Sequence, residues 1–157
     1  MRVCIGGTFN VFHKGHQLLI KTAVNQAGAK GYLFIGIATG ELVRSKPHIR
    51  PLSIRKKDVE SYLSNVQMKP DIKIEPISDI FGPTLKEDFD IIIVSPETRR
   101  NAEIINTKRQ KNDLKPLNIV EIPFVFAEDG LPIQSSRIIN GKIDAAGKRQ
   151  TKKFSQN

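Results

Sequence analysis

Residues 5–19 read IGGTFNVFHKGHQLL, and this stretch decides how the chain begins to fold. The apolar residues at its start are typical of a strand, which ends at two glycines. The short loop that follows ends in the pattern H-x-G-H (residues 13–16), at the start of a predicted amphipathic helix. A helix start offers backbone N–H groups without partners inside the helix, together with the positive end of the helix dipole. The stretch therefore predicts a site for an anion such as a phosphate group.

Neither of the two common phosphate-binding patterns occurs in the chain. There is no G-x-x-x-x-G-K-[ST], and residues 5–15 do not spell G-x-G-x-x-G. We therefore expect histidine side chains to take the place of a glycine-rich cradle at this site.

His13 and His16 leave a metal site open as an alternative, because imidazole is a common ligand of zinc. Such a site needs three or four ligands, and the remaining candidates are His48 and Cys4. His48 falls in a different loop, and Cys4 falls inside the first strand, where it is most simply a small buried apolar residue. We expect no resident metal.

The length of 157 residues predicts one domain with a real core. Hydrophobic residues make up 39 % and charged residues 26 % of the chain, which is typical of a globular protein. No apolar run reaches the roughly 20 residues that span a bilayer, and no signal peptide is evident. The chain has one cysteine, so no disulfide forms within it and a reducing compartment suits it. We expect a cytoplasmic protein without a membrane partner.

The net charge is +9, from 25 Lys and Arg residues against 16 Asp and Glu residues, which raises the alternative of a nucleic-acid-binding module. Four of the basic residues lie in the polar segment 148–157, which has no acidic residue. Aromatic residues make up only 6 %, and there is no Trp, so a stacking platform for single strands is poorly supported. Basic loops beside a helix start suit a small polyphosphate equally well. We expect residues 1–147 to form the domain, residues 148–157 to be a mobile basic tail, and nucleic acid not to be a partner.

Short apolar runs alternate with helical patterns along the chain, which is typical of an α/β fold. The run of residues 91–94 is continuous and β-branched, as expected for a strand buried on both faces of a parallel sheet. In the first helix we expect Leu18, Leu19, Thr22, Ala23 and Gln26 to form the buried stripe and Gly28 to end the helix. Strands are predicted at about 2–6, 31–38, 72–77, 90–94 and 118–123, and helices at about 15–27, 53–65 (with Ser53 as N-cap), 99–112 and 135–141.

Five such units predict a single Rossmann-like, doubly wound, five-stranded parallel sheet with helices on both faces. If the first strand is central, the chain moves outward through strands two and three and returns to place strand four beside strand one. Ligands bind beyond the carboxyl ends of the strands at such a switch point. The topology then gathers three polar segments in one crevice, namely residues 5–19, 95–100 and 134–137. Residues 39–52 are expected to form a loop.

The motifs support a family resemblance. Residues 7–16, GTFNVFHKGH, resemble the signature of the nucleotidyltransferase superfamily, and residues 133–139, IQSSRII, resemble its second element, I-S-S-T-x-x-R. The stretch from Val94 to Asp144 is similar to the archaeal and eukaryotic type of phosphopantetheine adenylyltransferase, through VSPET, AEIIN, LKPLNIV and AEDGLPIQSSRI. The resemblance covers residues 2–144. In the second element the chain departs from the family, with Gln134 for the first Ser, Ser136 for Thr and Ile139 for the last Arg.

The resemblance implies transfer of an adenylyl group from ATP to 4′-phosphopantetheine, which gives dephospho-coenzyme A and pyrophosphate. It also implies roles for particular side chains. Thr8 orients the attacking phosphate, His16 contacts the α-phosphate and Lys46 binds phosphate, and these three are the expected catalytic residues. Thr8, Lys46, Arg99 and Arg100 are the expected acceptor ligands. The expected ATP-binding residues are Gly6, Gly7, Thr8, Phe9, His13, His16, Ser135, Ser136 and Arg137.

Alternatives stay open for several of these residues. Ser135 and Ser136 also suit a simple helix N-cap, and Arg99 and Arg100 also suit a solvated helix face. Arg137, Arg99 or Arg100 would have to replace the arginine that the family has at Ile139. Mg²⁺ is implied by ATP chemistry, held largely by phosphates and water. A different acceptor, such as nicotinamide mononucleotide, is the alternative within enzymes, and a monomer is the expected state.

Overall fold

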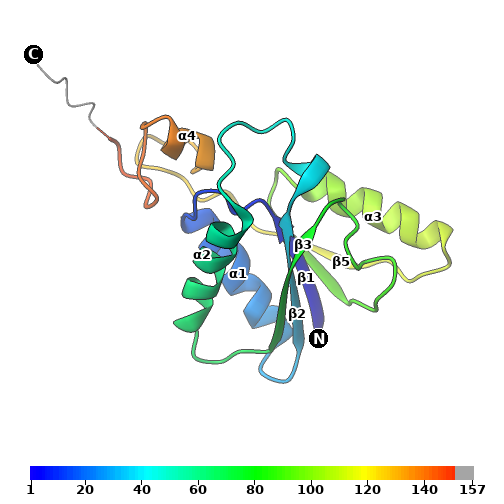
Figure 1. The fold of residues 1–157 in the computed structure, drawn as a ribbon. Coiled ribbons are helices and arrows are strands. Elements are labelled where there is room, and N and C mark those ends of the chain that lie inside the picture. The colour runs from blue at the N-terminus through cyan, green and yellow to red at the C-terminus, as the bar shows by residue number, and fades with distance from the viewer. Residues whose placement is uncertain (151–157) are drawn as a thin grey trace, which may run out of the picture.

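The computed structural model describes residues 1–150. Its sheet has five strands, all neighbours run parallel, and the order is β3-β2-β1-β4-β5 (Figure 1). β1 is central, and the chain moves outward through β2 and β3 before it returns to place β4 beside β1. The predicted strand order is therefore confirmed. The strands are β1 (Arg2–Gly7), β2 (Tyr32–Ala38), β3 (Asp71–Ile77), β4 (Ile91–Val94) and β5 (Asn118–Glu121).

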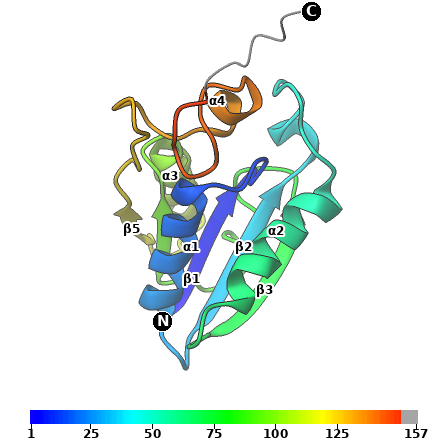
Figure 2. The same cartoon turned by 90° about the vertical axis from the view of Figure 1, so that its left-hand side faces the viewer.

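Helices cover both faces of the sheet, which confirms the predicted Rossmann-like α/β class. The first two α-helices pack on one face and the third packs on the other (Figure 1). Figure 2 shows the last, short helix beyond the carboxyl ends of the strands. No helix within residues 1–150 has both the length and the apolar character needed to cross a membrane. The helices are α1 (Lys14–Ala27), the 3₁₀ helix η1 (Gly40–Leu42), α2 (Leu52–Ser64), α3 (Arg99–Lys111) and α4 (Ser135–Ile139).

The central strands are buried on both faces because successive side chains of a strand point to opposite sides. Ile91 and Ile93 of β4 pack in the core beneath α1 and α2, whereas Ile92 and Val94 pack with Ala102 of α3. Both faces of β4 are therefore covered, so all four of its residues are apolar, as the sequence predicted.

The start of α2 and the buried face of α1 differ from the predictions. Pro51 is the N-cap of α2, and its carbonyl accepts hydrogen bonds from the N–H groups of Ile54 and Arg55. Ser53 therefore lies within the first turn, and its prediction as N-cap was wrong. In α1 the buried residues are Leu19, Ile20, Ala23, Val24 and Ala27, so the buried stripe is rotated from the predicted one. Gly28 ends α1 with a positive φ of 75°, as predicted.

The connection between β3 and β4 contains no helix, in agreement with the predicted helix ranges, so one of the five expected strand–helix units lacks its helix. Its residues form successive turns. Arg109 of α3 is 2 % exposed and donates to the carbonyl oxygens of Thr84 and Glu87 in this connection. A buried guanidinium thus satisfies turn carbonyls that a helix would otherwise have satisfied internally.

Residues beyond β5 build a small unit around a separate apolar cluster of Ala127, Ile133 and Ile143. In this unit Lys148–Gln150 return beside Lys142–Asp144, where Ile143 and Arg149 form an antiparallel bridge and the N–H of Gln150 donates to the carbonyl of Lys142. The hydrogen-bonded chain thus continues past the predicted domain boundary at residue 147. The rest of the predicted tail lies outside the described residues, and its mobility stays a prediction.

The glycines at the end of β1 and in β2 leave room for one side chain of β3. Gly6 and Gly36 are partners in the register of β1 and β2, and Ile77 packs over both. A Cβ atom at Gly36 would lie 2.9 Å from both Cδ1 and Cγ2 of Ile77, which is closer than carbon atoms approach. The edge strand is therefore matched to the glycines of its neighbour.

This contact makes a prediction about stability. Gly36→Ala is expected to lower the free energy of unfolding by about 1–3 kcal/mol, because the new methyl group overpacks the site. In an Ile77→Ala background the same substitution is expected to cost less than about 0.5 kcal/mol, because the colliding atoms are gone. Urea denaturation of the four proteins measures both values. Equal costs in the two backgrounds would contradict this account.

Candidate active site

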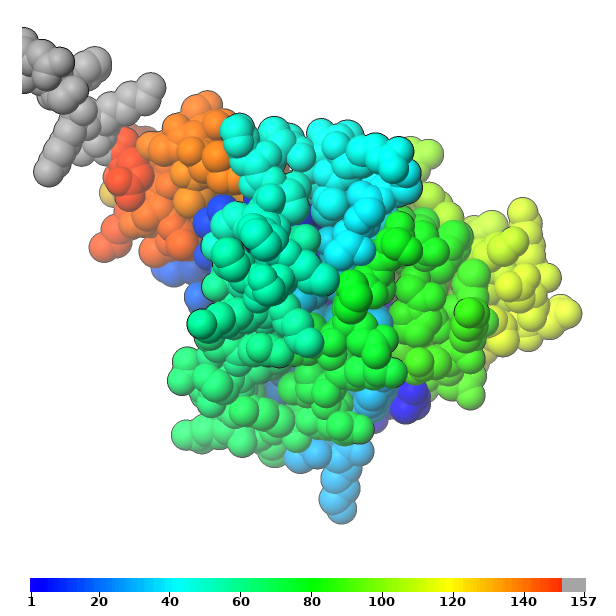
Figure 3. Space-filling model, in the orientation of Figure 1, coloured from blue at the N-terminus to red at the C-terminus, as the bar shows by residue number. Residues whose placement is uncertain are grey.

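A cleft of about 410 Å³ opens beyond the carboxyl ends of β1, β4 and β5. The three polar segments that the topology was predicted to gather all contribute to it. Figure 3 shows the segment after β2 (cyan) beside the α4 region (orange) over this edge of the molecule. Of the predicted site residues, those that line the cleft are Gly6, Gly7, Thr8, Phe9, His13, His16, Lys46, Ser135 and Ser136.

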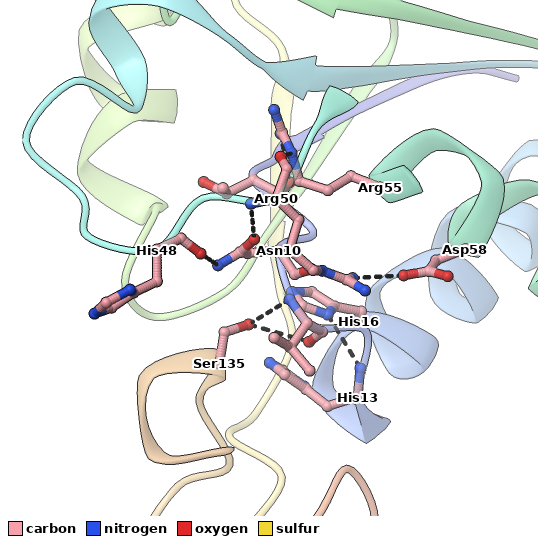
Figure 4. A network of polar contacts seen from close by, with 10 residues as sticks. Asn10, His13, His16, His48, Arg50, Arg55, Asp58 and Ser135 are labelled. Atoms are coloured by element: carbon pink, nitrogen blue, oxygen red, sulfur yellow. Dashed lines mark hydrogen bonds and ion pairs between the residues drawn. The ribbon is translucent and has the colours of Figure 1, made fainter. Parts of the chain in front are cut away.

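The start of α1 is capped by its own histidines. His13 is the N-cap, and its Nδ1 accepts from the N–H of Gly15 at 3.0 Å. Nδ1 of His16 accepts from the N–H of His13 at 3.2 Å (Figure 4). The N–H of Lys14 donates to the carbonyl of Ala145 at 3.3 Å. The expectation of free N–H groups at this helix start was therefore wrong for Lys14 and Gly15, because the protein itself satisfies them.

The same hydrogen bonds determine where the imidazole protons are. Each Nδ1 accepts a hydrogen bond, so each neutral ring carries its proton on Nε2. Within residues 1–150 neither Nε2 has a hydrogen-bond partner, and no fully buried side-chain nitrogen or oxygen lacks one, so neither Nε2 is fully buried. Both rings belong to residues that line the cleft. The site thus presents two imidazole donors in place of helix N–H groups.

Burial keeps both imidazoles neutral. It lowers the pKa of His13 from 6.5 to about 4, and burial together with the nearby His13 lowers the pKa of His16 to about 3. The two rings stack with centroids 3.8 Å apart, and His16 also lies 5.2 Å from the ring of Phe9. A neutral donor pair of this kind costs less to bury than two imidazolium ions.

Thr8 and Lys46 meet although they are 38 residues apart in sequence. Nζ of Lys46 donates to Oγ1 of Thr8 at 2.7 Å, on the exposed side of the cleft. Thr8 follows β1, and Lys46 belongs to the segment between β2 and α2. The structure therefore brings together two of the three predicted catalytic residues, with the third, His16, on the same cleft.

The loop around the glycines is shaped by the ring of Phe9. Phe9 is fully buried and has a positive φ of 50°, and a Cβ at Gly7 would lie 3.0 Å from its ring. Gly7 therefore has a packing reason to lack a side chain, beyond the predicted close approach of a nucleotide.

The second motif lies opposite the first. The hydroxyl of Ser135 accepts from the N–H of Val11 at 3.2 Å and lies 3.1 Å from the carbonyl of Val11, so it ties α4 to the first motif (Figure 4). Gln134, not a serine, is the N-cap of α4, and it makes no side-chain capping bond. The alternative that Ser135 is a simple N-cap was therefore wrong. Gln134 instead donates to the carboxylate of Glu97 across the cleft.

The predicted arginine ligands do not line the cleft. Arg137 pairs with Asp129 and donates to the carbonyl of Pro132 at 2.8 Å, and Arg99 contacts Glu103 and Glu121. Arg100 is exposed on α3 and is also absent from the lining. Ile139, where the family has an arginine, does line the cleft. Its wall there is apolar, formed by Ile122, Phe124, Val125, Ile133 and Ile139.

Four polar residues that the sequence reasoning missed form a network behind Thr8, drawn in Figure 4. Asn10 and Arg55 are buried, whereas Arg50 and Asp58 form an ion pair at 2.6 Å with about a third of each side chain exposed. Asn10 stands inside the quoted motif, and a polar residue between apolar neighbours was the only signal for it. Arg55 had none, because a buried arginine on an amphipathic helix looks like a solvated one in sequence.

The described residues provide no set of ligands for the alternative of a metal site. Within residues 1–150 no group of three or more His, Cys, Asp and Glu side chains is placed to hold a metal ion. Cys4 is buried on the α3 side of the sheet, and burial raises the pKa of its thiol to about 12. His48 lines the cleft, but Cys4 does not.

Known proteins resemble the chain over most of its length. Residues 4–141 match the cytidylyltransferase-like family model. A phosphopantetheine adenylyltransferase from Methanosarcina mazei is 42 % identical over 149 residues, which cover 94 % of this chain and 96 % of that protein. The chain belongs to the phosphopantetheine adenylyltransferase family. A family member from Methanosarcina acetivorans is 40 % identical over 148 residues, and this alignment covers 94 % of each of the two chains.

A solved structure shares this fold. The crystal structure of an Archaeoglobus fulgidus protein of unknown function aligns with a TM-score of 0.68 and 33 % identity. The alignment covers 78 % of this chain and 89 % of the other. The predicted family is thus confirmed by the comparisons.

The buried histidines make the stability of this family member depend on pH. The unfolded chain binds more protons than the folded one as pH falls below 6.5, because folding lowers both histidine pKa values to about 4 and about 3. Stability is therefore lost as pH falls through this window. Lowering the pH from 7 to 5 is expected to cost about 1–2 kcal/mol per histidine, at 1.36 kcal/mol per pKa unit.

Urea denaturation at pH 7, 6 and 5 measures this cost. A control variant, His13→Asn/His16→Asn, keeps a hydrogen-bond acceptor near each Nδ1 position and does not titrate, so its stability is expected to vary less over the same range. Equal pH dependence in both proteins would contradict the assignment of neutral histidines.

Proposed function

We propose that the chain catalyses transfer of the adenylyl group of ATP to 4′-phosphopantetheine, giving dephospho-coenzyme A and pyrophosphate. The observation that carries this proposal is 42 % and 40 % identity to two phosphopantetheine adenylyltransferases over almost the whole length of both chains. The cleft geometry supports it, because hydroxyl, ammonium and imidazole donors converge where phosphate groups would bind.

In the proposed reaction a phosphate oxygen of the acceptor attacks the α-phosphorus of ATP, and the bond between that phosphorus and the bridging oxygen to the β-phosphorus breaks. The electron pair leaves with pyrophosphate. A phosphate monoester has a second pKa near 6, so it is already a nucleophile near neutral pH and needs no strong general base. The protein's work is to position the two substrates and to stabilise charge in the transition state.

The residues of the cleft match that work. Lys46 and Thr8 would hold the acceptor phosphate, because their polar atoms lie together on the open side of the cleft. Nε2–H of His16 would donate to the α-phosphate and Nε2–H of His13 to the β-phosphate. These donors are held by capping bonds before any substrate binds, so they need little reorganisation during reaction.

Mg²⁺ would accompany ATP in this proposal. Glu97 is the one carboxylate side chain in the described lining of the cleft, and Gln134 already donates to it. Mg²⁺ prefers six oxygen ligands and keeps several waters, so the phosphates and water would supply most of them. When bound, the ion would neutralise charge on the leaving pyrophosphate. A cytoplasmic location and a monomeric state remain predictions.

The acceptor is tested directly with a panel. The protein is incubated with ATP and Mg²⁺ and with 4′-phosphopantetheine, unphosphorylated pantetheine or nicotinamide mononucleotide, and released pyrophosphate is measured. We expect release with 4′-phosphopantetheine and little with the other two. Faster release with nicotinamide mononucleotide would overturn the proposed acceptor. Tight, steeply salt-dependent binding to an oligonucleotide, without pyrophosphate release, would support the nucleic-acid alternative.

The imidazole donor is tested at His16. His16→Asn places an amide oxygen near the Nδ1 position and so retains the capping acceptor, but it removes the Nε2–H donor. We expect kcat to fall about 10²–10³-fold, the usual effect of losing one transition-state donor. ATP affinity, measured by calorimetry, is expected to change much less. His16→Gln, which places an amide N–H near Nε2, is expected to recover part of kcat. An equal loss of ATP affinity would show an ordinary binding contact instead.

A further inference from the structure

Asn10 spans the gap between two loops of the cleft and uses both ends of its amide. Its Nδ2 donates to the carbonyl of His48 at 3.0 Å, and its Oδ1 accepts from the N–H of Arg50 at 2.8 Å (Figure 4). The side chain is 5 % exposed. One buried amide therefore grips the backbone of residues 48–50, two residues beyond Lys46.

Two arginines hold the same two loops by further hydrogen bonds, and one of them, Arg55, bonds the backbone of Thr8. Nε of Arg50 donates to the carbonyl of Asn10 at 2.5 Å. Nη1 of Arg55 donates to the carbonyls of Thr8 at 2.9 Å and Ala38 at 2.8 Å, and its Nε donates to the carbonyl of Arg50 at 2.8 Å. Both loops are thus attached to the same buried guanidinium on α2.

The backbone that Asn10 holds is strained. His48 has a φ of 58°, a left-handed conformation that a residue with a β-carbon adopts only at a cost. Such a conformation persists when surrounding contacts over-determine it, and it clusters at functional sites. The two hydrogen bonds of the Asn10 side chain go to the carbonyl of His48 and to the N–H of Arg50, on either side of Ile49. They hold the backbone directly after His48 and so constrain its left-handed conformation.

We propose that Asn10 is a positioning residue, which holds the segment around His48 so that Nζ of Lys46 stays on Oγ1 of Thr8. This inference rests on the proposed function, in which Lys46 and Thr8 bind the acceptor phosphate. Asn10 itself lines the cleft, but the backbone of residues 48–50 uses both ends of its amide, so in this role it acts through Lys46. An amide is required because the position needs one donor and one acceptor, which neither Asp nor Leu supplies.

The expected effect is selective for the acceptor. In Asn10→Ala the ammonium of Lys46 loses its fixed place, and a misplacement of about 1 Å costs about 10²-fold in rate. We expect kcat/KM for 4′-phosphopantetheine to fall about 10–100-fold and KM for ATP to stay within about threefold, because His13 and His16 are held by separate bonds.

The fold offers a matched control. Asn106 of α3 makes the same two-ended grip, with Nδ2 donating to the carbonyl of Leu117 at 2.9 Å and Oδ1 accepting from its N–H at 2.7 Å. Neither Asn106 nor Leu117 lines the cleft. Asn106→Ala is expected to lose as much stability as Asn10→Ala, because each leaves a backbone donor and acceptor without a partner, but to keep kcat/KM within about twofold.

The decisive experiment is a double-mutant cycle with Lys46→Ala, read by pyrophosphate release. If Asn10 acts through Lys46, Asn10→Ala costs less than about threefold in the Lys46→Ala background, although it costs about 10–100-fold in the wild-type protein. Equal costs in both backgrounds overturn the proposal, since Asn10 would then act independently of Lys46. An equal activity loss in Asn106→Ala also overturns it, because the effect would be one of stability.

A readout without substrate separates this proposal from the proposed function. Hydrogen–deuterium exchange of the peptide around residues 44–51 is compared in the wild-type protein and Asn10→Ala. Faster exchange at the amide of Arg50, which donates to Asn10, supports the grip, and unchanged exchange overturns it. A wild-type protein that adenylylates no acceptor overturns the proposed function, and the grip is then judged by exchange alone.

Discussion

The cleft depends on a reciprocal pair of hydrogen bonds at the start of α1, from the N–H of Gly15 to Nδ1 of His13 and from the N–H of His13 to Nδ1 of His16. This pair ends the first loop, begins the helix and fixes the tautomer of both rings in one arrangement. It uses the N–H of Gly15, and the N–H of Lys14 donates to the carbonyl of Ala145. The remaining donors of the two rings are their Nε2–H groups, and burial keeps both rings neutral.

A second constraint brings the remaining donors to the same place. The loops after β1 and β2 lie side by side because their strands are neighbours, but parallel strands alone do not bring Lys46 to Thr8. That contact is formed where a buried amide and a buried guanidinium satisfy the carbonyls of both loops. α4 adds the opposite wall through the contact of Ser135 with Val11. Side chains thus join three of the segments that line the cleft, and Gln134 reaches the fourth, after β4, through its hydrogen bond to Glu97.

Much of this could be predicted because it follows from local pattern. The five strands, the four α-helices and the strand order all agree with the expectations to within a few residues, since apolar periodicity and the switch point of a doubly wound sheet determine them. What failed were details that depend on competition for hydrogen bonds. The N-cap of α2 is Pro51 and not Ser53. The N–H groups of Lys14 and Gly15 donate to other groups of the protein, and Arg137 forms an ion pair with Asp129.

The sequence by itself determined the α/β class, the family and the set of donors in the first motif, because local apolar periodicity and motif residues specify them. The central position of β1 was only a condition of the predicted topology, and the pairing of β1 with β2 and β4 decided it. Only the tertiary structure decided which donors line the cleft and which form hydrogen bonds with other groups of the protein. Asn10, Arg55, Ser135 and Arg137 carry the same polar groups in any conformation. Whether such a group binds a ligand or a neighbouring carbonyl depends on what lies within about 3 Å of it. The partners that decide this here lie from 5 positions away, for Arg137 and Pro132, to 124 positions away, for Ser135 and Val11.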